Sequence, residues 1–252
     1  MHSSLSLLKK SYDLRGIYPT QIDTSFFTLI GQAFGSWAPV GEIIIGGDAR
    51  LSTPELKSAM IAGLVSTGRV VRDIGLVSSD MLQFASIHHA ETTAMAIMVT
   101  ASHNPKEYNG FKCCLGNARP INLQEVGPEL IAIIDRAGLL SAEGGQVIKS
   151  SILEAWIDRV SAFITTDLSG LRIVADAGNG TAGIFMSALA ERLGFELIPL
   201  YFEPDGSFPN HHPSPIEAKN MVDLQTRVIA EHADIGVAFD GDADRAVLCD
   251  NR

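Results

Sequence analysis

Short apolar runs alternate along almost the whole chain with segments whose composition suits helices. Strands that are apolar throughout and separated by helices are typical of mostly parallel sheets that are buried on both faces. The alternation therefore predicts an α/β fold. The runs that we expect to form strands are residues 42–46, 70–74, 94–99, 171–175, 195–201 and 235–239.

Helix signals fill the intervals between these runs. We expect Thr53 to be an N-cap, because Pro54 follows it at a position that suits the first turn of a helix. Two further short strands are expected at 111–114 and 246–249, the first of them returning from a loop. The expected helices are residues 53–66, 81–90, 123–136, 153–163, 181–193 and 221–231.

A polar, glycine-containing stretch between residues 140 and 150 divides this pattern into two series. The chain has 252 residues, of which 46% are hydrophobic, so it is long and apolar enough to bury a sizeable core. We therefore expect two consecutive α/β domains, residues 1–147 and 148–252, with mixed, mostly parallel sheets covered by helices.

Net charge and cysteine content narrow the range of partners and compartments. The formal charge is −10, from 29 acidic and 19 basic residues, which argues against nucleic acid or an anionic membrane as a partner. A small anionic substrate is compatible with this charge, because a few local arginines decide its binding. Three cysteines, two of them adjacent, suggest neither a disulfide framework nor a zinc site. With no signal-peptide pattern and no apolar run long enough to span a bilayer, we expect a cytoplasmic protein.

The loop at residues 100–112, with the sequence TASHNPKEYNGFK, follows one of the apolar runs. Ligands of open α/β sheets gather at the carboxyl ends of strands. Ser102 offers a hydroxyl that can accept a phosphoryl group, and His103 or Lys112 can move protons if the fold brings it within hydrogen-bond reach. The alternative is an ordinary polar loop between two elements.

Three aspartates at alternate positions, Asp240, Asp242 and Asp244, follow another apolar run and precede Arg245. Carboxylates this close are costly without a cation, and their oxygens suit Mg²⁺. Arg245 is a candidate phosphate ligand, because guanidinium pairs with phosphate through two hydrogen bonds. An EF-hand does not fit, because it requires Gly and Glu where this chain has Arg245 and Asn251. A solvated acidic turn is the alternative.

The segment at 178–183 reads GNGTAG and has the spacing of a dinucleotide-binding turn. Glu203 lies at roughly the distance expected of a ribose ligand. However, polar Asp176 and Asn179 crowd the turn, and Pro204 follows the acidic residue. Nucleotide binding is one interpretation, and a tight turn with close packing of helix against sheet is the other.

Five segments together resemble the α-D-phosphohexomutases, in particular the branch of phosphomannomutases and phosphoglucomutases. They occur in the order of that family and span nearly the whole chain. The segments are SYDLRG at 11–16, TASHNP at 100–105, DAGNG at 176–180, PNHHP at 209–213 and DGDADR at 240–245.

The resemblance implies a nucleophile and a metal site. Ser102 would be the phosphorylated residue. Asp240, Asp242 and Asp244 would hold Mg²⁺, with an oxygen of phosphorylated Ser102 as a further ligand.

The resemblance also implies roles for five surrounding residues. Arg15 and Arg245 would stabilise phosphate near the reacting centre. His103 and Lys112 would be candidates for general acid and general base. Tyr12 would lie near the substrate, beside Arg15.

The implied enzyme is an isomerase that works by intramolecular phosphotransfer between hexose 1-phosphate and hexose 6-phosphate, with mannose or glucose as the sugar. Phosphorylated Ser102 would give its group to the sugar and form a hexose 1,6-bisphosphate, the activating intermediate, whose other phosphate would return to the serine. Mg²⁺ and arginine supply the charge neutralisation that this chemistry needs. The alternatives are a Mg²⁺-binding chain without turnover, a phosphatase-like enzyme with an aspartyl nucleophile in 240–244, and an interaction module descended from a mutase.

The family has four domains, and the chain resembles only the first two. We therefore expect domains III and IV to be absent and the chain to be a fragment with incomplete activity. Those domains would choose the sugar and grip its distal phosphate, and without that grip the substrate is not positioned for reaction. Apolar surface that domain III would cover favours self-association.

Overall fold

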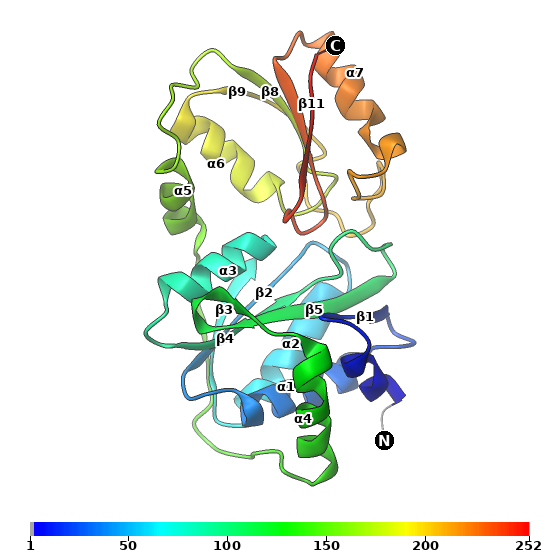
Figure 1. The fold of residues 1–252 in the computed structure, drawn as a ribbon, viewed down its shortest axis with the longest axis vertical. Coiled ribbons are helices and arrows are strands. Elements are labelled where there is room, and N and C mark those ends of the chain that lie inside the picture. The colour runs from blue at the N-terminus through cyan, green and yellow to red at the C-terminus, as the bar shows by residue number, and fades with distance from the viewer. Residues whose placement is uncertain (1–2, 252) are drawn as a thin grey trace.

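The computed structural model describes residues 3–251, which form two sheets, one above the other in Figure 1. The outermost residues of the two expected domains, 1–2 and 252, lie outside this range. The first sheet has the order β1-β5-β4-β2-β3-β7, with β6 paired to β5. Its strands are β1 (Leu14–Ile17), β2 (Glu42–Gly47), β3 (Val70–Leu76), β4 (Thr93–Val99), β5 (Tyr108–Leu115), β6 (Arg119–Pro120) and β7 (Gln146–Lys149).

The second sheet has the order β11-β10-β8-β9. In both sheets the central pairs are parallel and one edge is antiparallel, where β5 returns beside β4 and β11 returns beside β10. The expectation of mixed sheets in an α/β fold is therefore confirmed. The strands of this sheet are β8 (Arg172–Asp176), β9 (Glu196–Leu200), β10 (Ile235–Phe239) and β11 (Ala246–Cys249).

Helices cover both faces of the first sheet. The helices α1 (Thr24–Trp37), α2 (Thr53–Val65) and α4 (Leu123–Asp135) lie on the face that points away from the second sheet, and α3 (Ser79–His88) lies on the face toward it (Figure 1). The second sheet is flanked by α6 (Gly183–Leu193) and α7 (Val222–Ala230), and α5 (Leu153–Ser161) lies beside the segment that joins the two sheets. Short 3-10 helices η1 (Ser3–Lys9), η2 (Gly116–Ala118) and η3 (Ala218–Met221) complete the elements.

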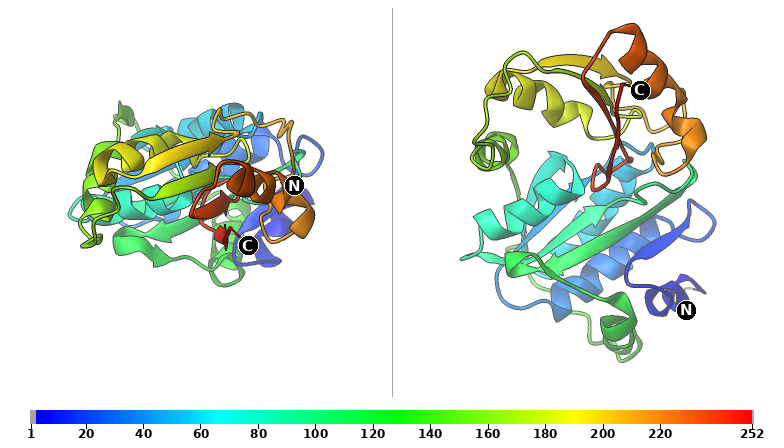
Figure 2. Two further views of the ribbon diagram at one scale, coloured as in Figure 1. Left: turned by 90° about the horizontal axis from the view of Figure 1, so that it is seen from above. Right: turned by 45° about the horizontal axis from the view of Figure 1, so that its top comes forward.

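Three apolar clusters hold these layers together. The first lies under α1, α2 and α4, where Phe111 of β5 meets the rings of Phe27 and Phe34 edge to face, with centroids 5.8 and 5.6 Å away. The second joins the two halves of the molecule, because it contains Met98 of β4 together with Phe185 of α6. The third lies between the second sheet and α7. The contact between the halves is therefore continuous apolar core and not only a polar cleft. Figure 2 shows the second half lying over the first when the molecule is viewed from above, on the left, and the two halves one above the other on the right.

The expected elements agree with the structure within a few residues at most ends, with one instructive exception at α2. Thr53 is not the N-cap of this helix, because Ser52 occupies that position and Thr53 is the first helical residue. The Thr53 hydroxyl instead donates to Asp48 Oδ1 at 2.6 Å and is therefore committed to the loop that precedes the helix.

The stretch between residues 140 and 150 contains a strand. It is β7, which pairs in parallel with β3 and so extends the first sheet. The expected boundary between residues 147 and 148 falls inside this strand. We therefore propose that the two domains divide after Lys149. No helix within residues 3–251 is both long enough and apolar enough to cross a bilayer.

Candidate active site

Two loops from different sheets meet between the domains. One is the serine loop, residues 100–107, which follows β4, and the other is the acidic loop, residues 240–245, which follows β10. The Ser102 hydroxyl donates to Asp240 Oδ2 at 2.7 Å, and both residues are buried. The backbones of the two loops are also in close contact, because a Cβ on Gly241 would lie 2.7 Å from the Ser102 carbonyl oxygen. The fold thus joins the two loops that the sequence singled out.

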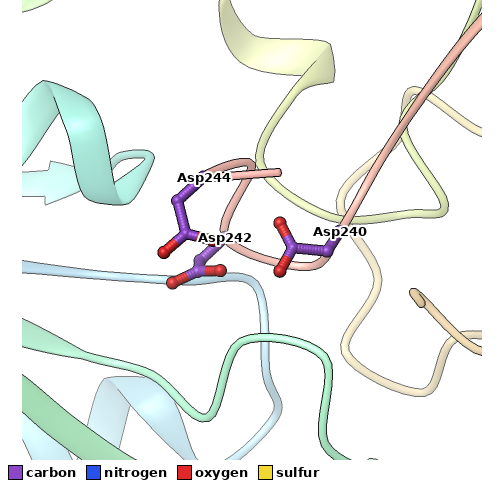
Figure 3. Close-up of side chains that lie close together, drawn as sticks. All are labelled: Asp240, Asp242 and Asp244. Carbon is purple, nitrogen blue, oxygen red and sulfur yellow. The ribbon is translucent and has the colours of Figure 1, made fainter. Parts of the chain in front are cut away.

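The acidic loop gathers three carboxylates within a very small space. Oxygens of Asp240, Asp242 and Asp244 lie within 4.8 Å of one another, and Figure 3 shows the three side chains clustered on one side of the loop. Burial, together with the charges of Asp242 and Asp244, raises the pKa of Asp240 to about 7. A proton or a cation is therefore needed to keep this cluster together.

Asp242 lies at the centre of the cluster and is completely buried. Its Oδ2 atom lies 2.6 Å from Lys112 Nζ and accepts a hydrogen bond from the Ser79 hydroxyl at 2.6 Å. Burial opposes its ionisation, but Lys112 and the hydroxyls of Ser79 and Ser102 outweigh that effect and lower the pKa of Asp242. Its other oxygen, Oδ1, is buried and has no hydrogen-bond partner. A buried, charged oxygen left open among three carboxylates fits the hard-ligand preference of Mg²⁺.

Lys112 projects from β5 into the same cluster. Its ammonium lies 2.6 Å from both Asp242 Oδ2 and Asp244 Oδ2. Burial acts to lower the pKa of Lys112, but the two aspartates more than compensate, so that this pKa is raised. The lysine is therefore positively charged and supplies the cluster with part of the charge that a bound cation would provide.

Arg245 and His103 form the other side of the site. Arg245 Nη2 lies 2.6 Å from His103 Nδ1, and its Nε lies 3.7 Å from Asp240 Oδ2. Burial, followed by the charges of Arg245 and Arg15, lowers the pKa of His103. The imidazole is therefore neutral near pH 7, with Nδ1 as an acceptor 3.3 Å from Ser102 Oγ.

Arg15 reaches the serine loop from β1. Its Nη1 donates to Asn104 Oδ1 at 2.6 Å and to the Ala101 carbonyl at 3.2 Å, while Asp13 receives its Nε and Nη2. Tyr12, in contrast, is 62% exposed and precedes the strand. The structure thus brings Ser102, His103, Lys112, Arg15, Arg245 and the three aspartates into one connected site and leaves Tyr12 at its edge.

The space around the glycine-rich segment at 178–183 is occupied by other parts of the protein. A Cβ on Gly180 would lie 2.7 Å from the Gly241 carbonyl oxygen, and one on Gly183 would lie 2.1 Å from the Phe202 carbonyl oxygen. Gly178 has a φ of +50°, and the ring of His211 lies next to it. Of the two interpretations of this motif, the structure supports the tight turn with close packing.

Several residues of the site were not singled out from the sequence. Asp48 and Arg50 lie at the carboxyl end of β2 under the serine loop, and Ser79 begins α3 and contacts the acidic loop. A signal for the first two existed, because GGDAR at 46–50 places charged residues directly after an apolar run. The rule that pointed to residues 100–112, that ligands gather at strand ends, applies equally to this segment.

Comparisons with known proteins give a consistent result for both halves of the chain. Residues 6–138 match the family model described as phosphoglucomutase/phosphomannomutase, alpha/beta/alpha domain I, and residues 154–252 match that of domain II. A phosphoglucomutase of Neisseria gonorrhoeae is 38% identical over 240 residues, which are 94% of this chain and 51% of that protein. A phosphomannomutase/phosphoglucomutase of Pseudomonas aeruginosa is 38% identical over 245 residues, 96% of this chain and 52% of the relative. The chain spans about half the length of the curated relatives it matches.

Solved structures agree with this assignment. A phosphoglucomutase/phosphomannomutase family protein from Burkholderia thailandensis superposes with a TM-score of 0.89 at 33% identity, over 100% of this chain and 56% of that one. A putative phosphomannomutase from Thermus thermophilus superposes with a TM-score of 0.82 at 25% identity, over 94% of this chain and 55% of the other. The sequence, the fold and the arrangement of the two loops lead to the same conclusion: this chain belongs to the phosphoglucomutase/phosphomannomutase family.

Proposed function

We propose that Ser102 accepts a phosphoryl group from a hexose phosphate and returns it, so that the chain performs the phosphoryl-transfer chemistry of a phosphohexomutase. The observation that carries the proposal is the contact of Ser102 Oγ with Asp240 Oδ2 at 2.7 Å across the domain boundary. It places a hydroxyl nucleophile directly beside a cluster of carboxylates that suits a divalent cation. The reaction interconverts hexose 1-phosphate and hexose 6-phosphate through a hexose 1,6-bisphosphate, with mannose or glucose as the sugar.

Asp240, Asp242 and Asp244 would hold Mg²⁺, and the phosphate oxygens on Ser102 would complete the site. When bound, the cation would neutralise charge on the phosphoryl oxygens. The open Oδ1 atom of Asp242 and the raised pKa of Asp240 support this role, because both mark a cluster that lacks positive charge. Lys112 would then exchange carboxylate contacts for contacts with the substrate.

Two arginines supply the remaining positive charge. Arg245 lies next to both His103 and Asp240, and Arg15 lies over Asn104 of the serine loop. Their guanidinium groups would bind the oxygens of the phosphoryl group on either side of Ser102. Phosphoryl transfer depends mainly on such positioning and charge neutralisation.

Proton transfer falls to His103 and Lys112. In the forward step a bond forms between Ser102 Oγ and phosphorus, and the bond between phosphorus and the sugar oxygen breaks. Once Arg245 turns from His103 Nδ1 to the phosphoryl oxygens, neutral His103 would take the serine proton, since its Nδ1 lies 3.3 Å from Oγ. The Lys112 ammonium would give a proton to the departing sugar oxygen. The return step reverses both transfers, with the sugar hydroxyl as the nucleophile. Tyr12, exposed at the edge of the site, would contact the sugar.

Intact mass spectrometry with peptide mapping tests the proposal. The protein is incubated with glucose 1,6-bisphosphate and Mg²⁺, and we expect one phosphoryl group on Ser102 that a hexose monophosphate then removes. The Ser102→Ala variant serves as the control and should gain none. A wild-type protein that remains unmodified would rule out the proposal, and phosphorylation that persists in Ser102→Ala would point to an aspartyl nucleophile.

Complete turnover is a separate question, because the chain spans about half the length of its relatives. We propose that residues 1–252 alone bind Mg²⁺ and exchange phosphate with Ser102 but do not complete isomerisation, because nothing in them is expected to hold the distal phosphate. A coupled assay with glucose 1-phosphate tests this, and robust formation of glucose 6-phosphate would contradict it.

Compartment and self-association remain predictions from the sequence. Three cysteines with free thiols suit the reducing cytoplasm, where we place the protein. Self-association would use exposed apolar side chains such as Ile229 of α7 and Leu248 of the edge strand β11, which are 62% and 63% exposed. Sedimentation velocity at increasing protein concentration distinguishes a monomer from a dimer.

A further inference from the structure

The guanidinium of Arg50 lies directly beneath the serine loop. Arg50 follows β2, and its side chain is completely buried. Every one of its five N–H donors has a partner. Nη1 donates to the carbonyls of Pro105 and Tyr108 at 2.7 and 2.9 Å, Nη2 to those of Ser102 and Asn104 at 2.7 and 2.6 Å, and Nε to Asp48 Oδ2 at 3.2 Å.

The backbone N–H of Ser102 is also held in place, through the ion pair that Arg50 forms with Asp48. Asp48 Oδ2, which accepts from Arg50, also accepts from the Thr100 hydroxyl at 2.7 Å. That hydroxyl in turn accepts the Ser102 N–H at 2.8 Å. The carbonyl of Ser102 is therefore held directly by Arg50, and its N–H is held by Asp48 through the Thr100 hydroxyl.

Ser102 needs such support, because its backbone has a φ of +51°. This is the left-handed region of backbone conformation, which residues other than glycine rarely adopt. Residues in such conformations persist only where the surroundings over-determine them. Here the carbonyl is fixed by Arg50 and the N–H by Thr100, and the outcome is an Oγ that points at Asp240.

The second domain covers the arginine. The ring of Phe208 lies over the Arg50 guanidinium, with its centroid 5.4 Å away, and a Cβ on Gly206 would lie 2.3 Å from the Leu51 backbone nitrogen. The segment around residues 206–208 therefore packs directly on the turn that carries Arg50. The hydrogen bonds to the serine loop are thus shielded from water by both domains, which strengthens them.

We propose that Arg50 is a positioning residue for phosphoryl transfer. It holds Ser102 in its left-handed conformation and so sets the direction of Oγ, without touching substrate or metal itself. The inference rests on the proposed function of Ser102, but it makes a separate claim about the backbone of the serine loop.

The test compares Arg50→Lys with Arg69→Lys. Arg69 is a matched control, because it also donates to three backbone carbonyls of the first domain, those of Gly35, Ala38 and Pro39, but far from the site in the fold. Lysine keeps the charge at both positions but cannot reproduce the planar fork of donors. Two quantities are measured for each protein: the rate of Ser102 phosphorylation against glucose 1,6-bisphosphate concentration, and hydrogen exchange of the peptide that covers residues 100–108.

For Arg50→Lys we expect the maximal rate to fall by at least about tenfold, as a misplaced reacting atom predicts. The concentration for half-maximal rate should stay near the wild-type value, and exchange should rise selectively in the serine loop. Arg69→Lys should melt earlier than wild type but keep its rate and its exchange in that loop. A wild-type rate together with unchanged loop exchange in folded Arg50→Lys would overturn the inference.

Thr100→Val provides the second variant if Arg50→Lys does not fold, because valine has nearly the same shape and removes only the hydroxyl. It should also slow phosphorylation and loosen the loop, and a wild-type rate and wild-type exchange would count against the inference. If wild-type protein takes up no phosphate, the proposed function fails, and loop exchange alone decides whether Arg50 and Thr100 fix the conformation of Ser102.

Discussion

The serine loop and the acidic loop reach the same point in the molecule but are stabilised by different means. The serine loop is held by its own domain, through the buried pair of Asp48 and Arg50 and a set of backbone carbonyls. The acidic loop has few bonds of its own, such as the one from the Ala243 N–H to the Asp240 carbonyl at 3.0 Å. Its carboxylates are held mainly by hydrogen bonds and ion pairs with residues outside the loop.

Those outside groups belong largely to the first domain. Ser79 binds Asp242 twice, through its hydroxyl at 2.6 Å and through its backbone N–H, which donates to the Asp242 carbonyl at 3.0 Å. Lys112 supplies the positive charge. The serine loop is therefore organised mainly by its own domain, whereas the carboxylate cluster of the acidic loop depends on contacts between the domains.

The largest effect should come from the centre of the acidic loop. The metal site is probed by calorimetry with Mn²⁺, which suits the same carboxylate ligands as Mg²⁺. Asp242→Asn should weaken Mn²⁺ binding by about 100-fold, because removing one member of a buried charge cluster costs about 3 kcal/mol. Hydrogen exchange in the serine loop should not change. Asp223→Asn is the control, because it removes an acidic group of the second domain that accepts a hydrogen bond from the Tyr201 hydroxyl and is not part of the acidic loop. Equal metal affinity in both variants would refute the assignment of the cluster.

The second effect should come from the backbone contact between the loops. Gly241→Ala places a methyl group where the Ser102 carbonyl lies 2.7 Å away, so the loops must separate. We expect Ser102 phosphorylation to slow by about 10- to 100-fold, the scale of a displacement near 1 Å. Gly138→Ala, whose Cβ would lie 3.3 Å from its nearest neighbour at the end of α4, should leave the rate unchanged. A wild-type rate in Gly241→Ala would mean that the loops need not touch.

A smaller effect should follow from removing one bond between the domains. Ser79→Ala loses the hydroxyl that orients Asp242, a bond to a charged group worth roughly 1.5 kcal/mol, so Mn²⁺ affinity should fall by about tenfold. Ser86→Ala is the control on the same helix, since that hydroxyl binds the Ala118 N–H instead. If both variants bind Mn²⁺ equally, the acidic loop does not depend on the first domain.

The smallest effect should be a pH dependence confined to the second domain. His211 Nε2 lies 2.9 Å from Asp176 Oδ2, with Tyr201 and Asp223 nearby. Burial acts to lower the pKa of His211, but its bond to Asp176 and the attraction of that carboxylate outweigh burial and raise it. This stabilisation is complete below the unfolded pKa of 6.5 and is lost as pH rises through the raised value.

Thermal melts between about pH 6 and pH 9 measure this dependence. The part of the fall in melting temperature that His211 causes should be less than about 4 °C, the shift that about 1 kcal/mol produces in a protein of this size. Asp240, whose pKa is raised to about 7, titrates in the same range and adds a fall that wild type and the histidine variants share. His211→Asn should reduce the fall, whereas His232→Asn, a change in the turn between α7 and β10, should not. A fall that is as large in His211→Asn as in wild type would contradict the role of His211.

The sequence was most informative where one physical signal acted alone. Apolar runs predicted β2, β4 and β10 well, because these buried strands consist almost entirely of apolar residues and glycine. It missed α1, although the signals were present: Asp23 accepts the Phe26 N–H as an N-cap, and polar residues recur every fourth position along one face, at Thr24, Thr28, Gln32 and Ser36. It also missed β7, a strand of four mostly exposed residues that is recognisable by its pairing with β3.

The candidate site was predictable in its parts but not in its connections. The roles suggested for Ser102 and the aspartates came from local motifs and from a family resemblance, and the structure does bring those residues together. Local sequence could not reveal that Ser79 would meet Asp242, because the bond joins residues 163 positions apart. Nor could it reveal Arg50 as a support, because its value depends on carbonyls that the serine loop presents only after folding.

The apolar cluster shared by the two halves has a consequence for how the chain acquires its structure. During synthesis the first sheet and α3 are complete before α6 has been made, so the first half's share of this cluster lacks the apolar side chains of α6, such as Phe185, until then. A growing chain that exposes such apolar surface is prone to aggregate or to recruit chaperones. The second domain supplies both α6 and the acidic loop, so covering this apolar surface and assembling the candidate site both depend on the folding of that domain.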